Sequence, residues 1–196
     1  MAACPINLTS LLPDCAALKS NAGVRDFGYY CRRVDITGVT RLSDGTVTGV
    51  TIATGKLKKF QTQKFQNGAE QSLATSDIRK TRFKQGYKLR VYARSQADRN
   101  GIESVLLAPD VVFFSPNNDN QIEIYGLTIG LEASAFAWNT GTKLGDDNTA
   151  LVTLEGSEPN LAPLFTTVAP ATAPAVNDEA ADFLVNVAYL DAKVGA

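Results

Sequence analysis

Hydrophobic and polar residues alternate along most of the chain, as expected when one face of a β-strand enters a core and the other stays wet. Between residues 24 and 34, for example, Phe27, Tyr29 and Cys31 occupy every second position. An Asp-Gly pair at 44–45 predicts a hairpin turn, because glycine tolerates a positive φ. About nine short strands are predicted, over residues 24–34, 36–42, 47–53, 60–66, 81–92, 110–114, 121–130, 131–138 and 150–154.

The clearest alternation is that of the strand predicted over residues 81–92. One face carries apolar side chains, with Gln85 as the exception: Phe83, Tyr87, Leu89 and Val91. The other face carries four cations: Arg82, Lys84, Lys88 and Arg90. The apolar face must enter a core, and the cationic face is either solvated or meets an anionic partner. We therefore treat the four cations as a candidate charged interface or lumen face.

Two segments depart from the β pattern. Residues 95–108 predict a short helix, with Ser95 as the N-cap, Asp98 in the first turn and Pro109 as the stop. After Gly156 the chain is rich in proline and alanine, which predicts an extended arm over residues 157–177.

A terminal amphipathic helix is predicted over residues 178–196, with an apolar stripe made of Phe183, Val187, Leu190 and Val194. Such a helix is marginal alone and must dock, either on its own domain or on a neighbouring molecule. Deleting residues 157–196 is expected to leave the β domain folded but to weaken assembly.

These elements predict a mostly β protein, built as a two-sheet β-sandwich or open barrel with one flanking α-helix. The predicted divisions are an N-terminal lead-in (1–22), the β-sandwich domain (23–156), the arm (157–177) and the terminal helix (178–196). No stretch approaches the roughly 20 apolar residues of a membrane helix, and residues 1–14 lack the pattern of a secretory signal. We expect a protein that does not enter membranes and is made in the cytoplasm of its host cell.

Charge is divided unevenly along the chain, although the net charge is only −1. Residues 1–100 contain 17 Lys and Arg against 7 Asp and Glu, whereas residues 101–196 contain 2 against 13. In one hypothesis, the basic half of the chain binds nucleic acid. In a second, basic and acidic surfaces of neighbouring copies bind each other. A third interpretation is that strands from both halves interleave in one sheet, so that the charges mix.

Candidate chemistry is sparse. The chain has no histidine, which removes the commonest general base near neutral pH and any Ser-His-Asp triad. Its three cysteines are too few for the usual four-ligand zinc site, and we interpret them as small buried side chains or a chance pair. No phosphate-binding loop, nucleophile elbow or zincin motif is present. The sequence therefore predicts no catalytic residue, no metal and no cofactor.

The predicted elements follow one another in a particular order. A strand with paired tyrosines (27–31) precedes a hairpin (39–51), a Thr-Gly-Lys turn (54–56) and a Phe- and Gln-containing strand (59–66). A strand and helix (87–93 and 95–108), a QIEIYG segment (121–126) leading to Gly-Leu (130–131), and a last strand (151–156) come next. This order, over roughly residues 15–158, resembles that of small virion proteins of tailed phages, especially those of Bacteroidetes phages and prophages. The arm and terminal helix are extra to this pattern.

The resemblance implies a tail tube-like fold and a subunit that assembles into rings, commonly hexamers, which stack around a lumen. Expected partners are copies of itself and other tail or neck proteins of the virion, with DNA only as passing cargo. The expected location is the virion tail, after assembly in the bacterial cytoplasm. A connector, tail-terminator or decoration protein is the first alternative. A barrel that binds single-stranded nucleic acid through the four cations is the second.

Overall fold

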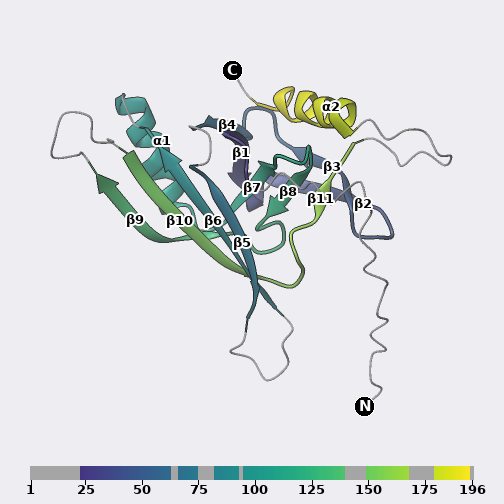
Figure 1. The fold of residues 1–196 in the computed structure, drawn as a ribbon, viewed down its shortest axis with the longest axis horizontal. Helices are drawn as coiled ribbons and strands as arrows, with labels where there is room; N and C mark the ends of the chain where they lie inside the picture. The colour runs from purple at the N-terminus through teal and green to yellow at the C-terminus, as the bar shows by residue number, and fades with distance from the viewer. Residues whose placement is uncertain are drawn as a thin grey trace, which may run out of the picture.

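The computed structural model describes residues 23–62, 66–74, 82–92, 95–139, 149–167 and 179–194. These residues form two β-sheets and two α-helices (Figure 1), which confirms the predicted mostly β sandwich with a flanking helix. The larger sheet has seven strands, in the order β2 (Ile36–Arg41), β3 (Val47–Ile52), β11 (Leu164–Phe165), β8 (Ile122–Tyr125), β7 (Val111–Pro116), β1 (Phe27–Arg32) and β4 (Lys58–Gln61).

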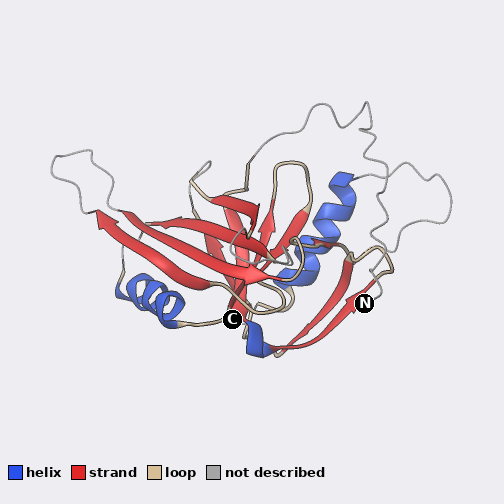
Figure 2. Ribbon diagram, turned by 90° about the horizontal axis from the view of Figure 1, so that it is seen from below, coloured by secondary structure: helices blue, strands red, loops and turns tan. Residues whose placement is uncertain are grey.

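The smaller sheet is antiparallel and has four strands, in the order β5 (Gly68–Leu73), β6 (Phe83–Val91), β10 (Thr149–Glu158) and β9 (Glu132–Asn139). Its centre is the β6–β10 ladder, in which nine consecutive residue pairs run from Ala150 opposite Val91 to Glu158 opposite Phe83. A bulge at Thr153 and Leu154 interrupts the β9–β10 ladder. Figure 2 shows these long strands side by side at one end of the molecule.

Each face of the seven-stranded sheet carries a hydrophobic cluster over its central strands. On one face lies a helix-side cluster, which joins the sheet to α2 (Glu179–Asp191). Its buried members are Tyr29, Cys31, Ile36, Val47, Val50, Ile52, Leu57, Val112, Phe114, Ile122, Ile124, Leu127, Phe165, Phe183 and Leu190. On the other face lies a sheet-side cluster, which joins the two sheets to α1 (Gln96–Leu107). Its buried members are Tyr87, Leu89, Ile102, Val105, Val111, Phe113, Tyr125, Leu131, Ala150, Val152 and Leu154.

Strand β7 contributes side chains to both clusters. All six of its residues are buried, and alternate side chains point to opposite faces. Phe114 therefore enters the helix-side cluster, whereas its neighbour Phe113 enters the sheet-side cluster and stacks on Tyr87 with ring centroids 4.4 Å apart. The continuous apolar run of β7 is typical of a strand that is covered on both sides.

Helix α1 begins as the sequence predicts. The Ser95 hydroxyl accepts a hydrogen bond from the Asp98 backbone N–H (3.1 Å), and the Asp98 carboxylate accepts one from the Ser95 N–H (2.9 Å). This reciprocal capping box satisfies two N–H groups that the helix itself leaves unpaired. Ile102 and Val105 are the buried residues of the helix, and Arg99 lies over the ring of Trp138 in β9.

Several elements depart from the expectation. Strand β8 ends at Tyr125, so it is shorter than the strand predicted over residues 121–130, and α2 ends at Asp191, before the predicted end at 196. Strand β5 was not predicted, because its sequence, GAEQSL, lacks an apolar face and lies at the edge of a sheet. Residues 157–177 are not simply an arm: residues 157 and 158 complete β10, and Leu164–Phe165 form β11 inside the larger sheet. Proline cannot donate to a sheet ladder, but its carbonyl can accept. The Pro163 carbonyl accepts from the Ile124 N–H at 3.0 Å, next to the two-residue strand that lies between β3 and β8. Residues 168–178 lie outside the described part.

Strands from the two halves of the sequence interleave. In the larger sheet, β11, β8 and β7 from the acidic half lie between β2–β3 and β1–β4 from the basic half. In the smaller sheet, β6 of the basic half pairs with β10 of the acidic half. The third interpretation of the charge split therefore describes the fold.

Candidate assembly surfaces

The four predicted cations lie along one face of the smaller sheet, which we call the outer face. Lys84 and Lys88 in β6 are exposed, Arg82 just before the strand is exposed, and Arg90 is half-buried. Among the described residues, no helix or strand covers this face. The opposite face of the same strand enters the sheet-side cluster, as the alternation predicted.

Acidic side chains from both neighbouring strands neutralise the two lysines. Lys84 Nζ lies 2.9 Å from a carboxylate oxygen of Glu155 in β10, and Lys88 Nζ lies 3.4 Å from Glu70 in β5. Both glutamates stand opposite Gly86, where an added Cβ would come within 3.0 Å of the Glu70 side chain. Exposed ion pairs of this kind add little stability. These pairs neutralise two of the four cations, Lys84 and Lys88.

Two aromatic residues near the cations, Tyr87 and Phe60, are not available for stacking against bases. Tyr87 is fully buried, and its hydroxyl is hydrogen-bonded with that of Ser115. Phe60 packs among Tyr30, Tyr87 and Phe113. Burial raises the pKa of Tyr87 well above its usual range. A nucleic-acid platform needs cations and aromatic rings on the same exposed surface, and these two rings enter the sheet-side cluster instead.

The smaller sheet has an open edge at both of its outermost strands. Strand β5 forms one edge and β9 the other, and no described strand pairs with their outer sides. Most residues of β9 are exposed, including Phe136 at 46%. An open edge presents a row of unpaired N–H and C=O groups, which is a template for pairing with another chain.

Two buried polar residues, Glu158 and Gln85, hold backbone segments together at the end of the sandwich. Only Gln85 could be noticed in the sequence, as the polar exception on the apolar face of β6. Glu158 is 2% exposed and accepts hydrogen bonds from three successive backbone N–H groups, those of Thr128 (3.1 Å), Ile129 (2.8 Å) and Gly130 (3.1 Å). No sequence pattern singled it out, because its partners are backbone atoms.

Gln85, the exception on the apolar face of β6, is the other residue. Its amide nitrogen donates to the Asn160 carbonyl, and its amide oxygen accepts from the Gly126 N–H, both at 2.9 Å. The Gln85 side chain therefore links the segment after β10, at Asn160, to the segment after β8, at Gly126. A buried amide must satisfy both its donors and its acceptor, which explains why the alternation breaks at this position.

The predicted docking helix lies on its own chain. Phe183 and Leu190 are buried in the helix-side cluster, and Val187 and Val194 are half-buried against it. The Asp191 carboxylate accepts from the Tyr29 hydroxyl (2.9 Å) and pairs with Lys59 (2.8 Å). Figure 1 shows α2 stretched over the larger sheet. The apolar stripe thus completes a core in its own molecule.

Cys31 lies in the helix-side cluster. Burial, with the charges of Asp35 and Asp110 adding to it, raises the pKa of its thiol to about 12. A thiol with that pKa stays protonated near neutral pH and is a poor nucleophile. Cys4 and Cys15 lie outside the described residues.

Within the described ranges, no group of three or more Cys, Asp or Glu side chains is placed to hold a metal ion. Neither α1 nor α2 is long and apolar enough to cross a membrane. No known protein family, curated protein or solved structure is significantly similar to this chain. The uncovered sheet face and the two open edges are the surface features of the described residues from which a function is proposed below.

Proposed function

We propose that this chain is a virion structural subunit of a tailed phage, a tail tube protein whose copies form stacked hexameric rings around a DNA conduit. The observation that carries the proposal is the four-stranded sheet with two open edges and one uncovered face. The subunit acts through surfaces that pair between identical molecules, without catalysis.

Strand direction favours a head-to-tail contact. The ladders of the smaller sheet are all antiparallel, so β5 and β10 run one way and β6 and β9 the other. When β9 of one copy lies beside β5 of the next, the antiparallel alternation continues across the boundary. Such a contact uses two different surfaces of each copy, and it generates a ring if the rotation closes.

The partly neutralised outer face suits the inside of a conduit. In the proposed ring this face lines the lumen, where Lys84 and Lys88 remain paired with Glu155 and Glu70. A row of four unpaired cations would hold DNA through its phosphates, because neutralised phosphates release counterions. The two ion pairs halve the number of cations free for such contacts, which weakens the hold on DNA that passes as cargo.

Electron microscopy and sedimentation at high protein concentration test the proposal. Tubes or stacked rings are expected. Isolated single rings would instead favour a connector or tail-terminator, and a particle that remains monomeric at every concentration would contradict self-assembly. Tight binding of oligonucleotides that weakens steeply with salt would favour the nucleic-acid alternative.

A pair of edge variants locates the contact. The double variant Ala135→Lys/Ala137→Lys places two charges on exposed positions of β9, and edge lysines oppose strand pairing. Its rings are expected to be lost while the circular dichroism spectrum is unchanged. The matched control, Ser157→Lys, adds a lysine to an exposed position of the central strand β10 and should assemble normally. Equal assembly of both variants would exclude the β9 edge.

A further inference from the structure

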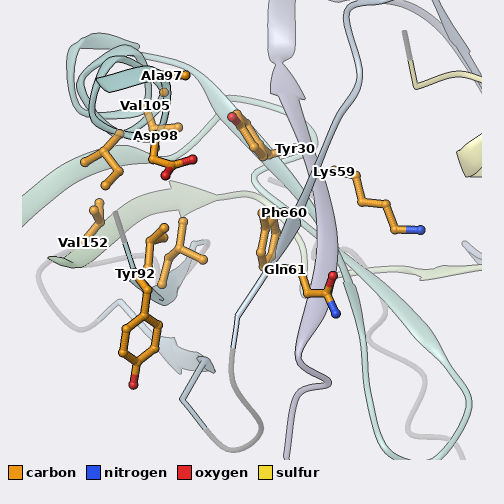
Figure 3. A pocket seen from close by; sticks show the side chains of 13 residues that line it. Tyr30, Lys59, Phe60, Gln61, Tyr92, Ala97, Asp98, Val105 and Val152 are labelled. Atoms are coloured by element: carbon orange, nitrogen blue, oxygen red, sulfur yellow. The ribbon is translucent and has the colours of Figure 1, made fainter. Parts of the chain in front are cut away.

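A groove runs between the edge strand β4 and helix α1. It consists of two adjoining clefts of about 330 and 390 Å³, which share Tyr30, Gly101 and Val105 among their lining residues. Figure 3 shows the first cleft, with Ala97, Asp98 and Val105 of α1 on one side and Phe60 and Gln61 of β4 on the other. The two clefts together border all four residues of β4.

The strand side of the groove has unpaired backbone groups. In an antiparallel ladder, every second residue bonds to the partner strand. The Thr62 N–H donates to the Asp26 carbonyl at 2.6 Å, so the backbone N–H and C=O groups of Phe60 and Lys58 also face β1. The corresponding groups of Lys59 and Gln61 therefore point away from β1. No described strand pairs with that side.

The same edge already takes part in one pairing. Leu57, which precedes β4, forms an isolated parallel bridge with Val194 after α2. By the alternation above, Leu57 uses the side turned away from β1. The edge can therefore accept an extended backbone, and its remaining positions, Lys59 and Gln61, lie along the groove.

The floor of the groove is apolar. Leu89, Val91 and Val152 line it from the smaller sheet, and Ile102 and Val105 line it from α1. An added strand places alternate side chains on opposite faces. Alternate side chains of an extended segment would therefore meet this floor, while its backbone pairs with β4.

Gly101 is the helix residue that gives the groove its room. A Cβ built at this position meets no atom within 4 Å, and the residue lines both clefts. Glycine within a helix costs about 1 kcal/mol relative to alanine, and nothing in the described part of the chain requires it there. A glycine facing an open groove allows another backbone to approach the helix closely.

Charge at one end of the groove indicates what kind of segment fits. Lys56 and Lys58 are exposed there and form no ion pair with any described residue. Arg32 also lines this end but is paired with Asp110 at 2.8 Å, and Asp35 is the one acidic residue that lines the second cleft. The excess of positive charge favours acidic residues in an occupant at this end.

We propose that the groove between β4 and α1 binds an extended, alternately apolar peptide segment of a partner protein, with acidic residues beside Lys56 and Lys58. The segment adds an eighth strand to the larger sheet, in the manner of β-strand addition to an open edge. This site is separate from the edges of the smaller sheet, so it functions whether or not the chain forms rings.

The test uses a fluorescein-labelled synthetic octapeptide, TVTVTVEE, and the full-length protein. Fluorescence polarisation is expected to show saturable binding, and amide chemical shifts of Lys59 and Gln61 are expected to move. A matched peptide, TVTVTVKK, should bind about ten-fold more weakly, because two ion pairs become repulsive contacts. Double substitution Lys56→Glu/Lys58→Glu should reverse that preference.

The variant Gly101→Trp blocks the groove without displacing any atom of the chain near the new Cβ. It is expected to melt no lower than wild type and to bind the octapeptide at least ten-fold more weakly. Gly101→Ala controls for the change in helix propensity and should keep most of the binding. Unchanged binding by the folded Gly101→Trp variant would overturn the proposal, as would an absence of binding at millimolar peptide. Binding that appears only after residues 195 and 196 are deleted would also overturn it.

Discussion

The two sheets of this protein differ in how much of their surface the chain itself covers. The seven-stranded sheet has a hydrophobic cluster on each face, so most side chains of β1, β7 and β8 are buried. The four-stranded sheet has one buried face, and its outer face and the edge strands β5 and β9 are exposed. The chain itself therefore covers most of the first sheet, whereas the second leaves one face and both edges open to other molecules.

The two sheets differ in the sequence pattern of their strands. A strand covered on both faces reads as a continuous apolar run, as in residues 111–114, whereas a strand with one free face alternates, as in β6. Substitutions should thus cost stability in the larger sheet and alter association in the smaller one.

Deleting residues 157–196 should abolish cooperative folding, contrary to the expectation from sequence alone. The deletion removes β11, which joins β3 to β8, and it removes Phe183 and Leu190 from the helix-side cluster. Thermal unfolding followed by circular dichroism measures the result. Leu184→Ala, on the exposed side of α2, is the control and should unfold cooperatively. A sharp transition in the truncated chain would show that the larger sheet does not depend on its last strand.

The same substitution should have different effects in the two sheets. Phe114→Ala removes a fully buried ring from the larger sheet and should lower the free energy of unfolding by roughly 3–5 kcal/mol. Phe136→Ala removes a ring that is 46% exposed on β9 and should cost about 1 kcal/mol or less. Urea denaturation of both variants gives the two values. Similar losses would contradict the proposed division between the sheets.

Within the smaller sheet, a buried and an exposed glutamate of β10 provide a finer comparison. Glu158→Gln should lower the free energy of unfolding by about 1–3 kcal/mol, because one carboxylate oxygen that accepts a backbone N–H is lost. Glu155→Gln removes only the exposed pair with Lys84 and should cost less than about 1 kcal/mol. Chemical denaturation at neutral pH measures both. Equal costs would mean that Glu158 does not hold the turn at 128–130.

The smallest expected effect is the pH dependence that Cys31 contributes. Burial raises the pKa of its thiol from the ordinary 9.0 to about 12, so the folded state keeps a proton that the unfolded chain loses. Above pH 9 the free energy of unfolding should therefore fall, by at most about 1.4 kcal/mol per pH unit for this group. Cys31→Ala should show a shallower decline between pH 9 and 10. Identical slopes would indicate that the thiol is not protected.

Local pattern was sufficient for most elements of the fold. Alternation predicted β6 with its two faces, and Ser95 with Asp98 predicted the start of α1, because both features depend on residues close together in the sequence. The stripe of Phe183, Val187, Leu190 and Val194 predicted an apolar helix face, but it left open which molecule that face would contact. Strand β5 gave no signal, since an exposed edge strand needs no apolar residues.

The mostly β class, the apolar and charged faces of β6 and the start of α1 could all be predicted, because each follows from residue spacing along the chain. Other features became visible only in the folded chain: β11 enters the larger sheet, Lys84 and Lys88 are paired with Glu155 and Glu70, and Gly101 faces an open groove. These features depend on strand order and on contacts between distant residues. Periodicity carries no information about either.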